Sequence, residues 1–265
     1  MPNKIIIPEQ VLIKLINEKK TCSEILKILK ISKSCLYRNL NEYKLSIPNY
    51  QNELKFDNKV FDKIDTEEKA YWLGFLYADG YVSNGKYNNS VELSLSAKDI
   101  DHLKKFKNFL KDKRKIKVSK VAKNFTRGRV LVTNKHFRNQ LIKLGCLPNK
   151  SLILKFPSDN IFHNKDLIIH FIRGYVDGDG CLSNTKTGRL SIEIIGTKEF
   201  LEGIRKYFPE FKSIRKTRSS EKGLNNFKIS CNSNKADTVA KRLYKDATIY
   251  LDRKFNKFAN LCRDV

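Results

Sequence analysis

The chain has 265 residues, 40% of them hydrophobic and 11% aromatic, so it can bury a core and is not globally disordered. Lysine and arginine total 53 against 28 acidic residues, and the formal net charge of +25 makes a polyanion, above all a nucleic acid, the expected partner. No stretch has the apolar length of a membrane helix or of a secretory signal, and the six cysteines form no CxxC pair. We therefore expect no membrane segment, disulfide framework or structural zinc. The expected location is an intracellular reducing compartment: the cytoplasm of a bacterium or phage-infected cell, or an organelle.

Residues 1–48 predict a small helical unit. Thr21 and Glu24 have the spacing of a capping box, which opens a helix, and a second short helix follows after a tight break. The segment TCSEILKILKISKSCLYRNL resembles a helix-turn-helix. Leu36 and Leu40 are expected to face inward. The residues then left for a DNA major groove are Lys33, Ser34, Tyr37 and Arg38. The alternative is a helical hairpin that packs on the rest of the protein.

Residues 49–68 are mostly polar, and we predict a linker there. The rest of the chain contains an internal repeat. The motif AYWLGFLYADGYVS at 70–83 returns as HFIRGYVDGDGCLS at 170–183. Similar patterns follow both copies in the same order. We predict an α+β fold of two pseudo-symmetric repeats, 69–160 and 161–265, each built as helix, two strands, helix, two strands, helix.

Small residues recur four apart in the helix of each motif, which places each pair on one helical face. These residues are Gly74 and Ala78 in the first copy, and Gly174 and Gly178 in the second. Glycine inside a helix costs about 1 kcal/mol relative to alanine, so their presence predicts close packing of the two helices on each other. Gly80 and Gly180 are expected to end these helices in the left-handed conformation.

Acidic residues stand at the ends of both predicted helices: Asp79 in the first copy, and Asp177 and Asp179 in the second. A carboxylate at a helix C-terminus opposes the helix dipole, and two converging carboxylates repel each other. A hard divalent cation would offset both costs. The pattern therefore predicts a metal site, and Asp79 and Asp179 are its expected ligands.

At these residues the sequence resembles the LAGLIDADG homing endonucleases of the single-chain, two-motif type. The motifs are WLGFLYADG at 72–80 and IRGYVDGDG at 172–180, and the resemblance covers about 69–265. One departure is Tyr77, where the family often has aspartate. The position of the family's metal-binding acid is retained in both copies, as Asp79 and Asp179.

The resemblance implies two αββαββα repeats whose saddle-shaped antiparallel sheets lie over the DNA major groove. It implies that the two acids, with the backbone carbonyls of Ala78 and Gly178, bind Mg²⁺ or Mn²⁺ and that both DNA strands are cut. Lys150 and Lys254 would be the basic residues that support the charge on the phosphate. The expected protein is a monomer, without an obligate protein partner, acting on a long, non-palindromic site in double-stranded DNA.

Basic and polar residues on or beside the predicted strands are expected to contact the DNA, because alternate side chains of a strand share one face. Arg127 and Arg129 are expected to flank a glycine turn. The full set is Lys115, Lys117, Ser119, Arg127, Arg129, Arg189, Arg215, Lys216 and Arg218.

Three other functions are compatible with parts of this pattern. An intron maturase would use the same scaffold on RNA, and a non-catalytic DNA-binding regulator would combine the helix-turn-helix with an inactive duplicated domain. The presence of both acids argues against each of these. An intein would be expected to end in His-Asn, so a free-standing or intron-encoded enzyme is the favoured interpretation.

Overall fold

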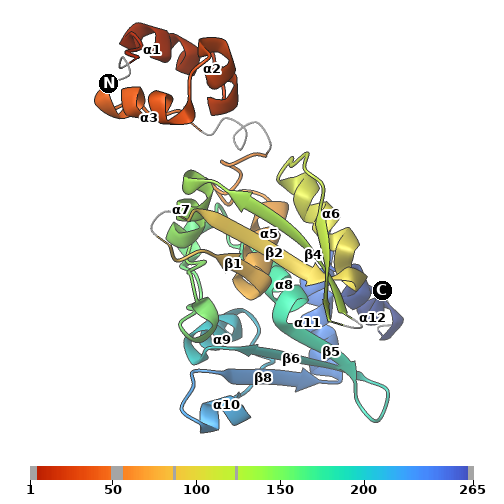
Figure 1. Cartoon of the computed structure of the whole chain (residues 1–265). Helices are drawn as coiled ribbons and strands as arrows, with labels where there is room; N and C mark the ends of the chain where they lie inside the picture. The colour runs from red at the N-terminus through yellow and green to blue at the C-terminus, as the bar shows by residue number, and fades with distance from the viewer. Residues whose placement is uncertain (1–4, 49–55, 86–87, 123–124, 262–265) are drawn as a thin grey trace. The chain divides into compact units, whose positions relative to one another are not determined.

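The computed structural model describes residues 5–48, 56–85, 88–122 and 125–261. The chain divides into two compact units, Met1–Asp57 and Asn58–Val265, which are drawn in Figure 1. None of the helices in the described ranges combines the length and the apolar character needed to cross a lipid bilayer.

The first unit is a three-helix structure with its own apolar core. Its helices are α1 (Glu9–Asn17), α2 (Cys22–Leu29) and α3 (Lys33–Glu42). The predicted capping box is present at the start of α2: the backbone N–H of Thr21 donates to Glu24 Oε2 at 2.7 Å, and the N–H of Glu24 donates to Thr21 Oγ1 at 3.3 Å. Leu36 and Leu40 of α3 are buried in the core, as predicted. The sequence therefore has the local signals and the apolar face that this small unit needs.

The segment 58–66 is part of the packed second unit, although the sequence predicts a linker there. Val60, Phe61 and Ile64 are buried, and the ring of Phe61 lies 5.7 Å from that of Phe137. Ile64 forms a parallel bridge to Phe162 at the start of the second repeat. The expected linker thus extends too far; residues 49–55 lie outside the described residues.

The second unit contains the two predicted repeats. The first comprises α5 (Glu67–Asp79), β1 (Gly80–Val82), β2 (Ser90–Ser96), α6 (Ile100–Phe109), β3 (Lys117–Ala122), β4 (Phe125–Thr133) and α7 (Lys135–Lys143). The second comprises α8 (Asp166–Asp179), β5 (Gly180–Asn184), β6 (Leu190–Gly196), α9 (Lys198–Tyr207), β7 (Ile214–Lys216), β8 (Phe227–Asn232) and α11 (Asn234–Tyr244). A short α10 (Arg218–Glu221) interrupts the second copy, and α12 (Asp252–Leu261) follows it. The predicted α+β class and the order of elements are confirmed.

Each repeat forms a four-stranded antiparallel sheet, in the order β1-β2-β4-β3 and β5-β6-β8-β7. Burial alternates along the inner strands: Val91, Leu93 and Leu95 of β2 are buried, while the residues between them are half-exposed. Helices α6 and α9 pack on the two sheets. Each sheet therefore has one apolar face in the core and one polar face.

Candidate active site

Helices α5 and α8 pack directly on each other through their small residues. A Cβ atom added at Gly74 would overlap the carbonyl oxygen of Phe171, and one added at Gly174 would overlap that of Tyr71. One added at Gly178 would meet the side chain of Ala78. The four small residues singled out in the sequence therefore lie where the two backbones approach each other.

The backbones of Gly80 and Gly180 are not in the left-handed region, so the prediction that these glycines end their helices in that conformation is wrong. Gly80 has φ −72° and ψ 137°, and Gly180 has φ −77° and ψ 149°, so each begins an extended strand. Glycine is required for another reason: an added Cβ would lie 2.5 Å from the carbonyl oxygen of Leu76 or Val176. The chain can thus leave each helix straight into a strand, directly after the acidic residue.

Asp79 and Asp179 are the last residues of α5 and α8, and their carboxylates are close together. Oδ2 of Asp79 lies 3.2 Å from the place where a Cβ of Gly178 would be. Both aspartates are accessible to solvent, but crowding by protein atoms removes part of their hydration. This desolvation, followed by repulsion from Asp179, raises the pKa of Asp79 to about 6; desolvation also raises the pKa of Asp179.

Lys150 and Lys254 occupy equivalent positions around this acid pair. The ammonium of Lys150 donates to the carbonyl oxygen of Gly80, and that of Lys254 donates to the carbonyl of Gly180 at 2.5 Å. Among the charges that favour the ionised acids, Lys254 is the strongest for Asp79 and Lys150 the strongest for Asp179. Burial lowers the pKa of Lys254 to about 8. Each lysine therefore supports the strand start of its own repeat and the acid of the other.

Tyr175 is a site residue that the sequence analysis missed. Its buried hydroxyl donates to the carbonyl of Ile195 at 2.9 Å and interacts with the carboxylate of Asp179. Tyr175, Asp179 and Lys150 line one cavity. Tyr175 stands four residues before Asp179 and therefore on the same helical face, which could have indicated its role. The equivalent residue in the first repeat is Phe75, so the position resembled ordinary core.

Asp177 and Tyr77, the sixth motif positions, are buried in the core beside the site and are not part of the solvent-accessible acid pair. Asp177 is fully buried and accepts hydrogen bonds from the hydroxyls of Tyr71 at 2.8 Å and Tyr244 at 2.7 Å, and from the N–H of Leu251 at 2.8 Å. The hydroxyl of Tyr77 donates to the carbonyl of Leu144 at 2.5 Å. Both residues hold the second unit together from inside the core.

The donor chemistry around Asp79 and Asp179 fits a hard divalent cation. The carboxylates are close, solvent-accessible and mutually repulsive. The carbonyl of Gly178, an expected ligand, also accepts a hydrogen bond from Lys254 at 3.2 Å. Within the described ranges no group of three or more His, Cys, Asp and Glu side chains could hold a metal. A cation here would depend on the two acids, backbone oxygens and water.

The candidate DNA contacts of the first sheet share its polar face. Lys117 is paired with Arg129, and Ser119 with Arg127, so these four side chains lie on one side. Lys115 is exposed and precedes β3. The prediction of a turn at Gly128 is wrong. Gly128 lies within β4, where an added Cβ would collide with the side chain of Ile100 on α6.

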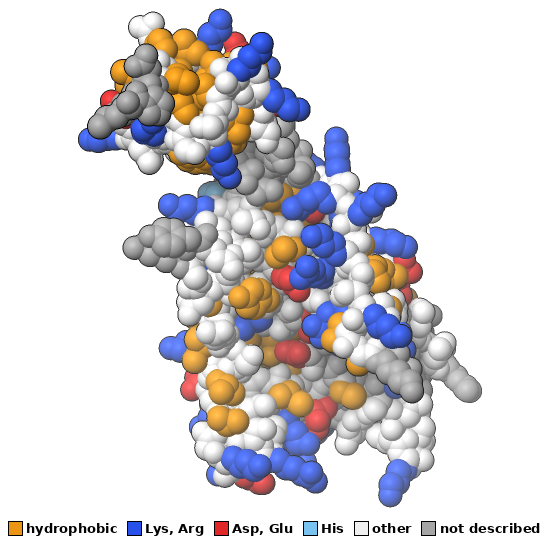
Figure 2. Space-filling model, in the orientation of Figure 1, with side chains coloured by type: hydrophobic (Ala, Val, Ile, Leu, Met, Phe, Trp, Pro, Cys, Tyr) orange, Lys and Arg blue, Asp and Glu red, His pale blue; other side chains and the backbone are white. Residues whose placement is uncertain are grey.

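In the second sheet, fewer of the residues predicted to contact DNA lie on the polar face. Arg215 is paired with Lys228 and shares its face, whereas Lys216 is paired with Phe227 and points the other way. Arg218 is in α10, outside the strands, and Arg189 lies before β6 with its guanidinium bonded to Asn234 at 2.9 Å. In the view of Figure 2, Lys and Arg side chains outnumber acidic ones over the sheets of this unit.

In the first unit, the expected DNA contacts lie on the exposed side of α3. Lys33, Ser34, Tyr37 and Arg38 are all exposed, and the ammonium of Lys33 lies 5.9 Å from the centre of the Tyr37 ring. Arg38 is partly engaged, because it donates to the carbonyl of Ile5 at 3.2 Å.

No protein-family model matches the chain, and no curated protein matches it significantly. Solved structures similar to it include the LAGLIDADG homing endonuclease I-GzeII in complex with a DNA target, at 13% identity, covering 73% of this chain and 88% of that one, with a TM-score of 0.47. The meganuclease I-SmaMI bound to uncleaveable DNA matches at 12% identity, 73% and 88% coverage and a TM-score of 0.48. The LAGLIDADG meganuclease I-AabMI bound to uncleaved DNA matches at 15% identity, 73% and 88% coverage and a TM-score of 0.44. The descriptions of I-GzeII and I-AabMI, and that of I-SmaMI bound to cleaved DNA, carry the name of the family that the two sequence motifs resemble.

Proposed function

We propose that this protein is a site-specific DNA endonuclease of the LAGLIDADG type that makes metal-dependent double-strand breaks at a long, non-palindromic target. The observation that carries the proposal is the pair of solvent-accessible aspartates, Asp79 and Asp179, which two closely packed helices hold together against their repulsion. The stability of the fold does not require this arrangement. A divalent cation that acts on phosphates does require carboxylates held close together.

Asp79 and Asp179, with the carbonyls of Ala78 and Gly178, would hold Mg²⁺ or Mn²⁺. When bound, such an ion supplies Lewis-acid stabilisation of the phosphate and lowers the pKa of bound water. Lys150 and Lys254 place positive charge beside the acids, where it stabilises an anionic phosphate. Their bonds to Gly80 and Gly180 also fix the start of each first strand relative to its acid.

The remaining surface is suited to a DNA duplex. Lys117, Arg127 and Arg129 on the polar face of the first sheet, and Arg215 on that of the second, can contact phosphates and base edges. The two sheets belong to one chain and differ in sequence, so we expect a monomer whose two half-sites also differ. Such a protein binds without an obligate protein partner.

The test is cleavage by the full-length protein of a library of DNA duplexes in Mg²⁺. We expect double-strand breaks at one long sequence, abolished by chelation and by Asp79→Asn or Asp179→Asn. Asp101→Asn is the matched control, because Asp101 is an exposed acid on α6 paired with Lys104 and should leave cleavage unchanged. Specific binding without cleavage would support a DNA-binding regulator, and selective binding of structured intron RNA would support a maturase; either result would contradict the proposal.

A further inference from the structure

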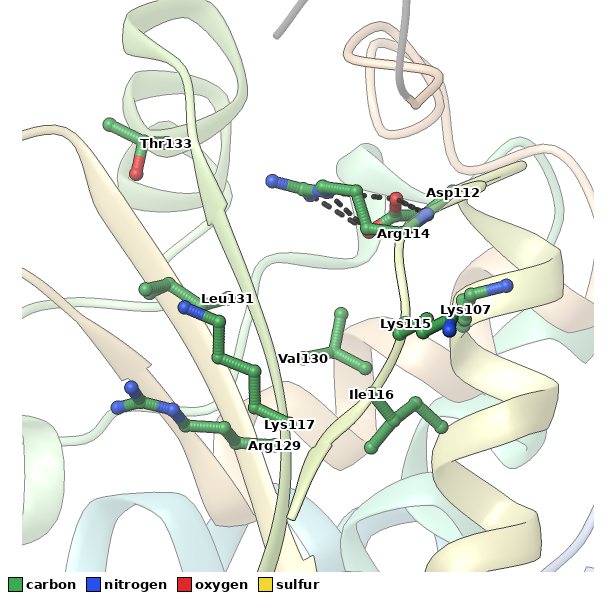
Figure 3. A pocket seen from close by; sticks show the side chains of 10 residues that line it. All are labelled: Lys107, Asp112, Arg114, Lys115, Ile116, Lys117, Arg129, Val130, Leu131 and Thr133. Atoms are coloured by element: carbon green, nitrogen blue, oxygen red, sulfur yellow. Dashed lines mark hydrogen bonds and ion pairs between the residues drawn. The ribbon is translucent and has the colours of Figure 1, made fainter. Parts of the chain in front are cut away.

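Each repeat has a surface hollow beside the last two strands of its sheet. In the first repeat, β3 begins to pair with β4 only at Lys117 and Arg129, and the preceding residues separate from β4. Figure 3 shows the resulting hollow, with Ile116 and Val130 inside it and polar side chains around it. Its basic lining residues are Lys107, Arg114, Lys115, Lys117 and Arg129.

The second repeat has an equivalent hollow beside β7 and β8. Arg215 occupies the register position of Lys117, since its partner Lys228 corresponds to Arg129. Counting back from each of these two strand residues gives a base three positions earlier and an acid five positions earlier. The equivalent pairs are Arg114 with Lys212 and Asp112 with Glu210, and all four line the hollows. The same pattern of charge therefore recurs at the same place in two divergent repeats.

Each hollow has an excess of positive charge: five bases and one acid line the first, and four bases and one acid line the second. In the first, buried Asp112 fixes the guanidinium of Arg114 by bonds of 2.9 Å to Nε and 2.8 Å to Nη2. In the second, Lys212 and Lys235 line the hollow together, and the nearby Lys212 side chain lowers the pKa of Lys235. Two exposed ammonium groups brought together on one surface repel each other, and an anion between them would remove that repulsion.

We propose that the two hollows bind backbone phosphates of the DNA, one in each half of the target. Lys117 and Arg215 line the hollows and also lie on the polar faces of the two sheets, so an anion there is next to the expected DNA surface. Phosphate contacts fix the position of a duplex without identifying its bases, and an equivalent pair of them would set the register of both half-sites. This inference rests on the proposed function.

The test uses the full-length double variant Lys212→Gln/Lys235→Gln and the target duplex in Ca²⁺, with affinity measured against salt concentration. We expect the slope of log K against log salt to fall by about 2, because each lysine neutralises about one phosphate. Affinity should fall by the same factor for target and unrelated DNA. Lys115→Gln/Lys117→Gln should act in the same way. The matched control is Lys104→Gln/Lys206→Gln, which removes two exposed lysines from the helices that pack on the buried faces of the sheets.

Neutral methylphosphonate substitutions, placed one at a time in the target, locate the contacts. In one half-site, one substitution should weaken binding by the wild-type protein but leave binding by Lys212→Gln/Lys235→Gln unchanged. In the other half-site, a different substitution should weaken binding by the wild-type protein but leave binding by Lys115→Gln/Lys117→Gln unchanged. Unchanged salt slopes, or variants that alter base preference, would overturn the phosphate assignment while leaving the nuclease intact. A wild-type protein that binds no DNA would instead refute the proposed function. Lys212→Arg/Lys235→Arg, which keeps the charge, should restore the slope.

Discussion

The charges of Asp79 and Asp179 should lower the stability of the metal-free protein. The pKa of Asp79 is raised to about 6 in the folded state, whereas an aspartate in the unfolded chain titrates near 4. The penalty is therefore absent below about pH 4, grows as the pH rises, and is complete above about pH 6. Asp79→Asn should raise the unfolding free energy at pH 8 by about 1 kcal/mol, a value reduced for screening by the water that reaches this site.

Thermal melts of Asp79→Asn and wild type at pH 4 and pH 8 measure this effect. The two proteins should differ at pH 8 and agree at pH 4. Mg²⁺ should stabilise the wild type and have a smaller effect on the variant, because binding to the native state raises its stability. A variant that is less stable than wild type at pH 8 would show that Asp79 is a structural acid.

Asp177→Asn should have the opposite effect, because three donors converge on that carboxylate. An asparagine amide replaces one acceptor oxygen with an N–H₂ group that faces a donor inside the core. We expect a loss of about 2–4 kcal/mol in unfolding free energy, measured by denaturant titration. Stabilisation by Mg²⁺ should persist in the folded variant, and its loss would place Asp177 at the metal site.

At the scale of the elements, the contact of α5 with α8 controls the distance between the acids. Gly74→Ala would stabilise an open helix by about 1 kcal/mol. Here the added methyl group would overlap the carbonyl of Phe171, so we expect a net loss of about 3 kcal/mol or more. Denaturant titration of Gly74→Ala and Gly174→Ala tests both sides of the contact. A gain in stability from either variant would mean that the helices can separate without cost.

The sequence predicted the order of these elements well, because the period of apolar residues and the internal repeat are both local signals. It also predicted that Asp79 and Asp179 end their helices, because each follows a helix pattern and precedes a glycine. It failed where the cause is tertiary. The conformation of Gly80 depends on the space beside Leu76, and the burial of Val60 and Phe61 depends on contacts with distant elements.

At the scale of the whole molecule, the chain has two units that differ in what they can do. The second unit contains the paired acids and both sheets, whereas the first has a small core and an exposed basic helix face. Residues 58–66 belong structurally to the second unit, although they lack a hydrophobic period. A useful truncation must therefore retain them, which the sequence pattern alone did not indicate.

Removing residues 1–57 should leave DNA cleavage intact, weaken binding and shorten the protected stretch of DNA. The acids and the sheets all lie after this cut, while Lys33 and Tyr37 on α3 are exposed and suited to a DNA groove. Footprinting and affinity measurements on the truncated and full-length proteins check this. In the full-length protein, Lys33→Gln/Tyr37→Ala should reproduce the loss of affinity, whereas Lys14→Gln/Lys19→Gln, which alters exposed lysines of α1 and its end, should have less effect. An unchanged footprint and affinity after truncation would show that the first unit does not contact DNA.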